Sequence, residues 1–267
     1  MSKKEAKNAL KGLRERLNEL QDMLYADRRY GVLVVLQGID TSGKDSTTKS
    51  VFEQVGPLGS HVYSFGPPGG EELQHDFLWR YHRRAPEKGQ IAIFNRSHYE
   101  AVLVERVKGI VPPETWGSRY DQLNRFEEML VAENIIVLKF LLHISKKEQR
   151  KRLQERIDNS RKHWKFDPAD LRERERWDDY MLAFEDALTH CNTPHAPWHI
   201  VPADRKWYRD TVVARAIVRR LEELDLRYPP GPAGIEGLRV ESSYPARLAR
   251  SSSWSRRSSR NCRASSW

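Results

Sequence analysis

The chain has 267 residues, of which 39% are hydrophobic and 31% are charged, and its net charge is +9. This length fits one α/β domain with appendages, or at most two small domains. No apolar run approaches the roughly 20 residues that cross a bilayer. The N-terminal segment lacks the apolar stretch of a secretory signal. Two cysteines form neither a disulfide framework nor a zinc site by themselves. We therefore expect a reduced, cytoplasmic protein with no membrane partner.

The positive charge is concentrated at the C-terminal end. Residues 229–267 contain seven Arg and two acidic residues and contribute +5, whereas residues 1–228 contribute only +4 from 39 basic and 35 acidic residues. This C-terminal extension is Ser/Arg-rich without periodicity, which predicts disorder from about residue 242. An RNA-binding arm is the alternative for the tail. Net charge alone is weak support for a nucleic-acid partner, and we expect no specific one.

The first predicted element is an amphipathic helix in an N-terminal extension over residues 1–30. Leucines recur there in steps of three and four, at Leu10, Leu13, Leu17, Leu20 and Leu24. Two interpretations are open for this stripe. It either packs on its own domain, which we favour, or makes a contact between subunits.

Apolar runs rich in β-formers alternate with helical patterns over residues 31–228. The strands are expected at 32–36, 61–65, 91–94, 135–144 and 198–202, and the helices at about 46–55, 71–84, 99–108, 118–133, 146–157, 168–190 and 206–225. The first and fourth runs are nearly continuously apolar, as in strands buried on both faces of a parallel sheet. The alternation predicts a three-layer α/β/α fold.

A phosphate-binding loop is predicted between the first strand and the first helix, where the sequence reads GIDTSGK. Gly38 and Gly43 allow backbone angles at which successive amides converge on an anion. The helix that starts near Lys44 adds the positive end of its dipole, and the lysine adds a mobile charge for the phosphoryl group. The predicted phosphate contacts are Gly38, Thr41, Ser42, Gly43, Asp45 and Ser46.

Two carboxylates of this loop predict a metal. Asp45 stands where such loops usually carry a hydroxyl, and Asp40 lies inside the loop. Carboxylates beside phosphates would repel the substrate unless a cation lies between them, which predicts Mg²⁺, with Mn²⁺ as the alternative. Asp40 is the preferred ligand. Asp45 either shares the metal or interacts with the helix N-terminus, and Ser46 offers a hydroxyl one residue late.

The third predicted strand ends in Asn95 and Arg96, where P-loop proteins usually place an acidic residue. Polar groups at the carboxyl end of a parallel strand lie where ligands bind. Arg96 would present a fixed fork of donors to phosphates, or would merely pair with a helix acid. Asn95 can contact a hydrated metal or a phosphate but cannot act as a base.

A basic lid is predicted over about residues 156–176. Residues 146–165 hold nine Lys/Arg and three acidic residues, and residues 158–166 interrupt the helical pattern. A cationic connector between two helices indicates a lid that closes over phosphates. Its predicted contacts are Arg156, Arg161, Lys162 and Lys165. The helix before the lid opens with Ser145 and Glu148, the pattern of a capping box.

Two loops are predicted to face a substrate. Asp204, Arg205 and Lys206 follow the last strand, where nucleoside-handling P-loop proteins present a loop to the base or ribose, and are the predicted nucleotide contacts. The Gly/Pro-rich stretch SFGPPGGEE over residues 64–72 follows the second strand and predicts a shaped loop.

Five segments together resemble the polyphosphate kinase 2 family. They are GIDTSGKD, PPGGEELQHDFLWRYH, FNRSHYE, HISKKEQRKRLQERIDNSRKHWKFDPAD and APWHIVPADRKWYRD, and they lie in order within about residues 10–240. The resemblance implies a P-loop kinase fold related to thymidylate kinase, with a lid. It implies phosphoryl transfer between inorganic polyphosphate and nucleotides with Mg²⁺. A basic lid suits such a polyanion.

The resemblance also implies catalytic roles. These fall on Asp40, Lys44, Asn95, Arg96 and, in the lid, Arg156. The Asn95 form looks like the branch that accepts nucleoside mono- and diphosphates, so AMP and ADP are the expected acceptors, with guanine nucleotides as a further option. Family habit and the leucine stripe favour a homodimer or homotetramer.

Three functions are therefore in competition. The first is a reversible polyphosphate:nucleotide phosphotransferase. The second is a nucleoside monophosphate kinase that uses ATP. The third is a non-catalytic polyanion- or RNA-binding protein, which would have no need of Lys44, Arg96 and a full lid together.

Overall fold

The computed structural model describes residues 1–240, so the disorder predicted from about residue 242 lies outside the described residues. The chain divides into one unit over Met1–Pro229 and a second over Pro230–Trp267. Within the second unit, residues 230–240 form turns without a helix or strand. No helix among residues 1–240 combines the length and apolar character required to cross a membrane.

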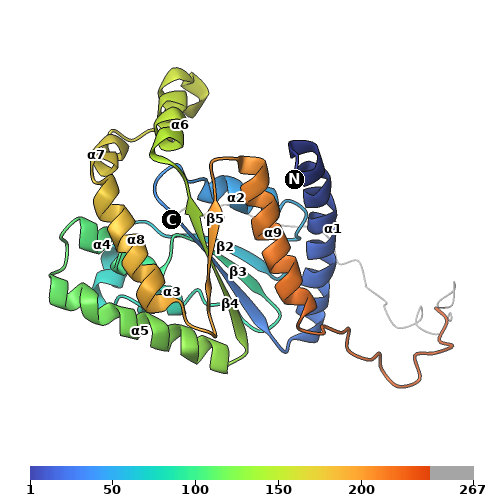
Figure 1. Cartoon of the computed structure of the whole chain (residues 1–267). Helices are drawn as coiled ribbons and strands as arrows, with labels where there is room; N and C mark the ends of the chain where they lie inside the picture. Colours follow the sequence, from blue (N-terminus) through green and yellow to red (C-terminus); the bar gives the residue numbers. More distant parts are fainter. Residues whose placement is uncertain (241–267) are drawn as a thin grey trace, which may run out of the picture. The chain divides into compact units, whose positions relative to one another are not determined.

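A five-stranded parallel sheet forms the centre of the first unit (Figure 1). Its order is β2-β3-β1-β4-β5, with β1 at Gly31–Gln37, β2 at Ser60–Ser64, β3 at Ile91–Asn95, β4 at Ile135–His143 and β5 at Trp198–Pro202. The central strand β1 is buried along its whole length, and β4 beside it is buried at all but two positions. The prediction that these two apolar runs form strands buried on both faces of the sheet is confirmed.

Helices cover both faces of this sheet and complete the predicted three layers. One face carries α1 (Lys3–Asp27), α2 (Lys44–Val51) and α9 (Lys206–Glu222), and the other carries α5 (Pro113–Ala132) and α8 (Trp177–Cys191). On α1, Leu10, Leu17, Leu20 and Leu24 are buried, and the helix packs against α9. The own-domain interpretation is confirmed, and these four leucines are unavailable for a subunit contact.

Three predicted helices are each split into shorter pieces. The pattern at 71–84 becomes η1 (Gly70–Gln74) and α3 (Trp79–His82), and that at 99–108 becomes η2 (His98–Ala101) and α4 (Val104–Val107). The helix predicted at 168–190 becomes α7 (Ala169–Glu175) and α8, with a turn at Arg176 between them. Asp76 causes the first break, because its carboxylate accepts hydrogen bonds from the amides of Leu78 and Trp79 and starts a new turn. The Ser97 hydroxyl likewise accepts from the Tyr99 amide at the start of η2.

A buried polar network fixes η2 to the sheet. The Lys139 ammonium, in the middle of β4, donates to Glu127 Oε2 at 2.6 Å and to the Tyr99 hydroxyl at 2.8 Å. His98 Nε2 lies 3.0 Å from the other Glu127 oxygen, and all four side chains are fully buried. These bonds connect η2 to β4 and α5 and so hold η2 in one position, although the buried Nδ1 of His98 has no hydrogen-bond partner.

The segment predicted as a lid extends beyond the carboxyl edge of the sheet (Figure 1). The predicted range, about residues 156–176, begins in the last turn of α6 (Lys146–Asp158) and continues through η3 (Ser160–Lys165) and α7 (Ala169–Glu175). The predicted capping box at the start of α6 is only half formed. The Ser145 hydroxyl accepts from the Glu148 amide, but the Glu148 carboxylate bonds to Arg152 and the Ser145 amide donates to Asp204. The second half of that prediction is wrong because a tertiary contact replaces the local one.

Candidate active site

The loop between β1 and α2 requires glycine at both ends. Gly38 has a φ of +152° and Gly43 a φ of +105°. A Cβ atom at Gly38 would lie 2.6 Å from the Leu142 carbonyl oxygen, and one at Gly43 would collide with the Arg209 guanidinium. Thr41 also has a positive φ, of 66°. The loop therefore has the tightly turned backbone in which amides converge on an anion.

Lys44 lies at the start of α2 with its side chain folded back over the loop. Its ammonium donates to the Gly38 carbonyl at 2.7 Å and to the Ile39 carbonyl at 3.4 Å, and only 8% of the residue is exposed. Burial holds the pKa of the Lys44 ammonium below its usual range, although the nearby Asp40 carboxylate opposes the shift. The lysine is thus a desolvated charge at the mouth of the loop.

The end of β3 lies beside this loop because β3 pairs with β1 in parallel, with Asn95 opposite Leu36. Arg96 Nη2 donates to Asp40 Oδ1 at 3.0 Å, and Asn95 Nδ2 donates to Asp45 Oδ1 at 2.5 Å. Arg96 pairs with a loop carboxylate and not with a helix acid. Its φ of +62° is uncommon for a residue with a side chain, a conformation that is often found at functional sites.

Both candidate metal ligands are therefore part of the loop site. Among residues 1–240 there is no cluster of three or more His, Cys, Asp or Glu able to hold a metal alone. Mg²⁺ is usually bound by one or two carboxylates together with substrate phosphates and water. Asp40 and Asp45 fit this arrangement, and the buried hydroxyls of Thr41 and Ser42 have no hydrogen-bond partner. The donor set suits a metal that arrives with a phosphate substrate.

A charged cavity of about 600 Å³ opens above the loop, and we call it the phosphate cavity. Its lining joins the loop, the end of β3 and the lid. The basic groups on it are Lys44, Arg96, Arg152, Arg156, Lys162, Lys165 and Lys206, and Thr41, Gly43, Asp45, Ser46 and Asn95 also line it. Most of the predicted phosphate contacts thus come together. Gly38 lies on a neighbouring cavity, Ser42 is fully buried, and Arg161 does not line this cavity.

Two lid residues are tied to acidic partners in the phosphate cavity. Arg156 Nη1 donates to Asp170 Oδ2 at 2.9 Å and to the Lys165 carbonyl at 3.0 Å, and the Lys162 ammonium lies 3.6 Å from a Glu155 oxygen. Burial and the nearby Asp40 carboxylate raise the pKa of Asp170, although Arg156 opposes this. The lid side of the cavity therefore holds cations in exchangeable ion pairs.

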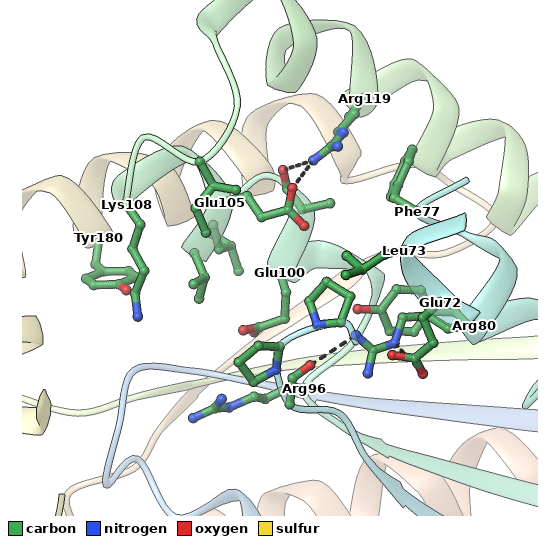
Figure 2. Close-up of a pocket in the computed structure, with 18 of the residues that line it drawn as sticks. Glu72, Leu73, Phe77, Arg80, Arg96, Glu100, Glu105, Lys108, Arg119 and Tyr180 are labelled. Carbon is green, nitrogen blue, oxygen red and sulfur yellow. Dashed lines mark hydrogen bonds and ion pairs between the residues drawn. The ribbon is translucent and has the colours of Figure 1, made fainter. Parts of the chain in front are cut away.

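A second cavity, of about 340 Å³, lies on the other side of Asp40, Gly66 and Arg96, three residues that line both cavities. We call it the apolar cavity, because its walls include Pro67, Pro68, Leu73, Phe77, Leu103, Val104, Ile110 and Phe184. Figure 2 shows Arg80 turned toward Glu72 and Arg119 turned toward Glu105, pairs that neutralise charge on this wall. The Gly/Pro-rich loop predicted to face a substrate forms part of this lining.

Glu100 is a site residue that sequence reasoning missed. It lies on η2, lines the apolar cavity and accepts a hydrogen bond from Gln37 Nε2 at 3.1 Å. Burial raises the pKa of its carboxyl group, which Arg96 and Lys44 partly offset. A signal was available, since Glu100 follows Arg96 by four residues at the end of a predicted strand.

Of the predicted nucleotide contacts, Lys206 lines the phosphate cavity, while Asp204 and Arg205 line neither of the two cavities. Asp204 instead uses its carboxylate to accept from the Ser145 amide at 2.8 Å.

A parallel sheet whose first strand leads through a glycine-bounded loop to a buried lysine, beneath a basic helical segment, defines a P-loop kinase. The model of the polyphosphate kinase 2 family (PPK2) matches residues 1–229, and the chain belongs to that family. The predicted family, fold class and polyphosphate-dependent phosphotransferase activity on nucleotides are thereby confirmed.

Relatives match most of the length of the chain. The chain is 48% identical over 239 residues to the AMP/ADP-polyphosphate phosphotransferase of Meiothermus ruber, covering 90% of each protein. It is 44% identical to the ADP-polyphosphate phosphotransferase of Rhodopseudomonas palustris, covering 80% of this chain and 78% of that one. The crystal structure of polyphosphate kinase 2 from Arthrobacter aurescens TC1 has a TM-score of 0.85 at 38% identity and covers 87% of this chain and 83% of its own.

Proposed function

We propose that the chain catalyses reversible phosphoryl transfer between inorganic polyphosphate and AMP or ADP, with Mg²⁺. The observation that supports this most is the pair of cavities of different character that share Asp40, Gly66 and Arg96. Two substrates that enter from different sides would meet at these residues. The Meiothermus ruber relative, named for both AMP and ADP, supports the choice of acceptors.

Polyphosphate belongs in the phosphate cavity in this proposal. The loop amides, Lys44 and Arg156 face the terminal phosphate, and Lys162 and Lys165 of the lid face the following ones. A polymer of identical charged units needs repeated cations and little shape recognition, which the Lys/Arg lining offers. Lys206 also lines this cavity, so it is placed to contact the polymer.

The nucleoside belongs in the apolar cavity, with its phosphate directed toward Arg96. Apolar walls with a few polar groups are the usual environment for such a ligand. Phe77 and Leu103 offer surfaces for a base. The expectation that Asp204, Arg205 and Lys206 contact the nucleotide stays a prediction.

The transfer itself needs little acid–base chemistry. An anionic phosphate oxygen of the nucleotide attacks the terminal phosphorus of polyphosphate, and the bond from that phosphorus to the bridging oxygen breaks. The polymer leaves one unit shorter, carrying the bridging oxygen's electron pair. Lys44, Arg96 and Arg156 neutralise charge on the transferring group. Mg²⁺ held by Asp40, Asp45 or both would screen the phosphate oxygens further. Asn95 orients Asp45 and takes no proton.

The test is an assay without ATP. Purified protein with polyphosphate, Mg²⁺ and either AMP or ADP should form ADP and ATP, respectively. If it forms no product from polyphosphate but converts AMP when ATP is added, the ATP-dependent kinase is the correct function. Repeating the assay with EDTA, and with Mn²⁺ in place of Mg²⁺, tests the metal.

A cytoplasmic location and a homodimer or homotetramer stay predictions. Light scattering of the purified chain measures the second directly. A mass of about one chain, near 31.3 kDa, would contradict it.

A further inference from the structure

The carbonyl groups of the phosphate-binding loop are all engaged by side chains. Each main-chain carbonyl from residue 38 to residue 42 accepts a hydrogen bond from a residue that lies outside this stretch. The donors are Lys44 to Gly38 (2.7 Å) and Ile39 (3.4 Å), Gln149 to Asp40 (3.3 Å), Arg152 to Thr41 (2.9 Å) and Ser42 (3.1 Å), and Arg209 to Ser42 (3.2 Å).

Arg152 makes the most of these contacts among the donors outside the loop and helix α2. Besides the two loop carbonyls, its Nη2 donates to the carbonyls of Ala203 at 2.7 Å and Asp204 at 3.0 Å, and its Nε donates to Glu148 at 2.8 Å. Only 7% of the residue is exposed. A rigid fork of five N–H donors suits this set of carbonyls. The single ammonium of a lysine could not reach the carbonyls of residues 41–42 and those of residues 203–204 at once.

Apart from Lys44, the donors come from two helices far away in the sequence. Gln149 and Arg152 lie on the buried face of α6, the helix that leads into the lid, and Arg209 lies fully buried on α9. Arg209 Nη2 also donates to the Ser46 hydroxyl at 2.9 Å, and its guanidinium packs where a Cβ atom of Gly43 would be. Gln149 and Arg209 line neither cavity, whereas Arg152 holds the loop from a position that also borders the phosphate cavity.

We infer that Arg152, supported by Gln149 and Arg209, is a positioning residue that keeps the loop carbonyls turned away from the phosphate cavity. The inference rests on the proposed function, in which the loop amides bind polyphosphate. A peptide unit whose carbonyl is fixed on one side presents its N–H on the other. A carbonyl that rotated into the cavity would place a partial negative charge against phosphate oxygens and would remove a donor. Arg152 lines the phosphate cavity, but its five hydrogen bonds to Glu148 and to main-chain carbonyls engage its guanidinium, so its role here is to position the loop and not to bind phosphate.

The experiment measures binding of tripolyphosphate to the full-length protein by calorimetry, with Mg²⁺ and without nucleotide. Arg152→Lys keeps the charge and loses the fork, and Arg152→Gln loses both. Matched controls are Arg150→Lys and Arg150→Gln, because Arg150 is an exposed arginine two residues away on α6. We expect both Arg152 variants to weaken tripolyphosphate binding at least tenfold, and both Arg150 variants to stay within twofold of the parent protein.

The kinetic readout separates positioning from general damage. The Arg152 variants should show a raised KM for polyphosphate and a lowered kcat, with ADP affinity within twofold. Tripolyphosphate affinity of Arg152→Lys equal to that of the parent would overturn the inference, because charge alone would then suffice. An equal loss of ADP affinity would overturn it too, since the effect would not be confined to the loop.

A second variant keeps the inference testable if the Arg152 variants do not fold. Gln149→Met removes the donor to the Asp40 carbonyl, whereas Gln149→Glu also removes it but keeps an oxygen that accepts from Arg174 Nη1. We expect about a threefold loss of tripolyphosphate affinity in both variants; an unchanged affinity would count against the role of these donors. Measurements on the parent protein distinguish failure of the proposed function from failure of the positioning role. If it binds no tripolyphosphate and forms no product from polyphosphate, the proposed function fails; if it does both and the variants match it, only the positioning role fails.

Discussion

The two cavities that meet at Asp40, Gly66 and Arg96 differ in the chemistry of their walls. The phosphate cavity is lined by cations from α2, the end of β3, α6, the lid and the start of α9, whereas the apolar cavity combines proline, leucine and aromatic side chains with charged residues that are mostly paired. A cavity that binds mainly through charge suits a polymer of identical charged units, and a cavity with apolar walls suits a nucleoside. Changes on one wall should therefore affect one substrate, and changes at the shared residues should affect the transfer step.

The largest effect is expected at Lys44, which belongs to the transfer step. Lys44→Met keeps the length of the side chain and removes the buried ammonium. We expect kcat to fall about 1,000-fold, the upper range for loss of a donor that stabilises transition-state charge. The coupled assay without ATP measures it, and a melting temperature within a few degrees of the parent shows that the fold is intact. A loss of less than tenfold would remove Lys44 from the central role given to it.

Arg96 tests the junction itself. Arg96→Lys keeps one charge but loses the planar fork, one arm of which pairs with Asp40. We expect kcat to fall about 100-fold, with the KM of each substrate changed by much less. Activity equal to that of the parent would show that the fork is not needed where the cavities meet.

Arg156 tests the phosphate cavity alone. Arg156→Gln removes a lid cation that is paired with Asp170. We expect the KM for polyphosphate to rise about tenfold, comparable to the loss of one charged hydrogen bond, and the KM for ADP to stay unchanged. The KM for polyphosphate should also rise with added salt in the parent protein, and less steeply in the variant. Equal increases in the KM for polyphosphate and the KM for ADP would contradict the assignment of the two substrates to separate cavities.

Phe77 tests the apolar cavity alone. Its ring lies on the cavity wall, with the Arg119 guanidinium 4.6 Å from its centre. Phe77→Ala removes apolar surface that would contact a base, so the KM for ADP should rise about tenfold, from roughly 1.4 kcal/mol of lost burial. The KM for polyphosphate should not change. An ADP affinity that survives this substitution would point to a nucleotide site elsewhere, as at Asp204–Lys206.

Substitution of Glu100 is expected to give the smallest effect. Glu100 differs from the other glutamates that line the apolar cavity. Glu72, Glu105 and Glu173 are each paired with a basic residue there, whereas Glu100 bonds to the neutral Gln37. Burial raises the pKa of Glu100.

A carboxyl group whose pKa is raised on folding destabilises the fold as pH increases from its unfolded value through its folded value. Glu100→Gln should therefore melt higher than the parent at pH 7, by about 2–4 °C for each kcal/mol relieved. The gain should vanish near pH 3, well below the carboxyl's ordinary pKa of 4.5, where the parent carboxyl is protonated in both states. Thermal unfolding at the two pH values measures this, and a gain that does not depend on pH would exclude the carboxylate as its cause.

Local patterns predicted the sheet and the loop well, because each depends on neighbouring residues. The apolar run before Gly38 fixed the strand, and the two glycines and Lys44 fixed the loop. Asn95 and Arg96 were placed correctly because parallel strands end at the same edge. These features need only the periodicity of the chain and its turn residues.

The remaining features depend on contacts between distant segments. Arg152 donates hydrogen bonds to carbonyls about 110 residues earlier in the chain. In the sequence it is only one of several basic residues in a basic segment, and composition does not predict this contact. Its spacing of three from Gln149 was a usable signal, since both fall on the helix face that contains Leu153. The apolar cavity draws on residues from 38 to 184, and no single stretch of sequence predicts it.

The most direct test of the two-cavity account is the double variant Arg156→Gln with Phe77→Ala, assayed with polyphosphate and ADP without ATP. If the substrates occupy separate cavities, its KM for polyphosphate will equal that of Arg156→Gln alone, and its KM for ADP will equal that of Phe77→Ala alone. The account is contradicted if either substitution changes both constants, because the two walls would then belong to one shared site.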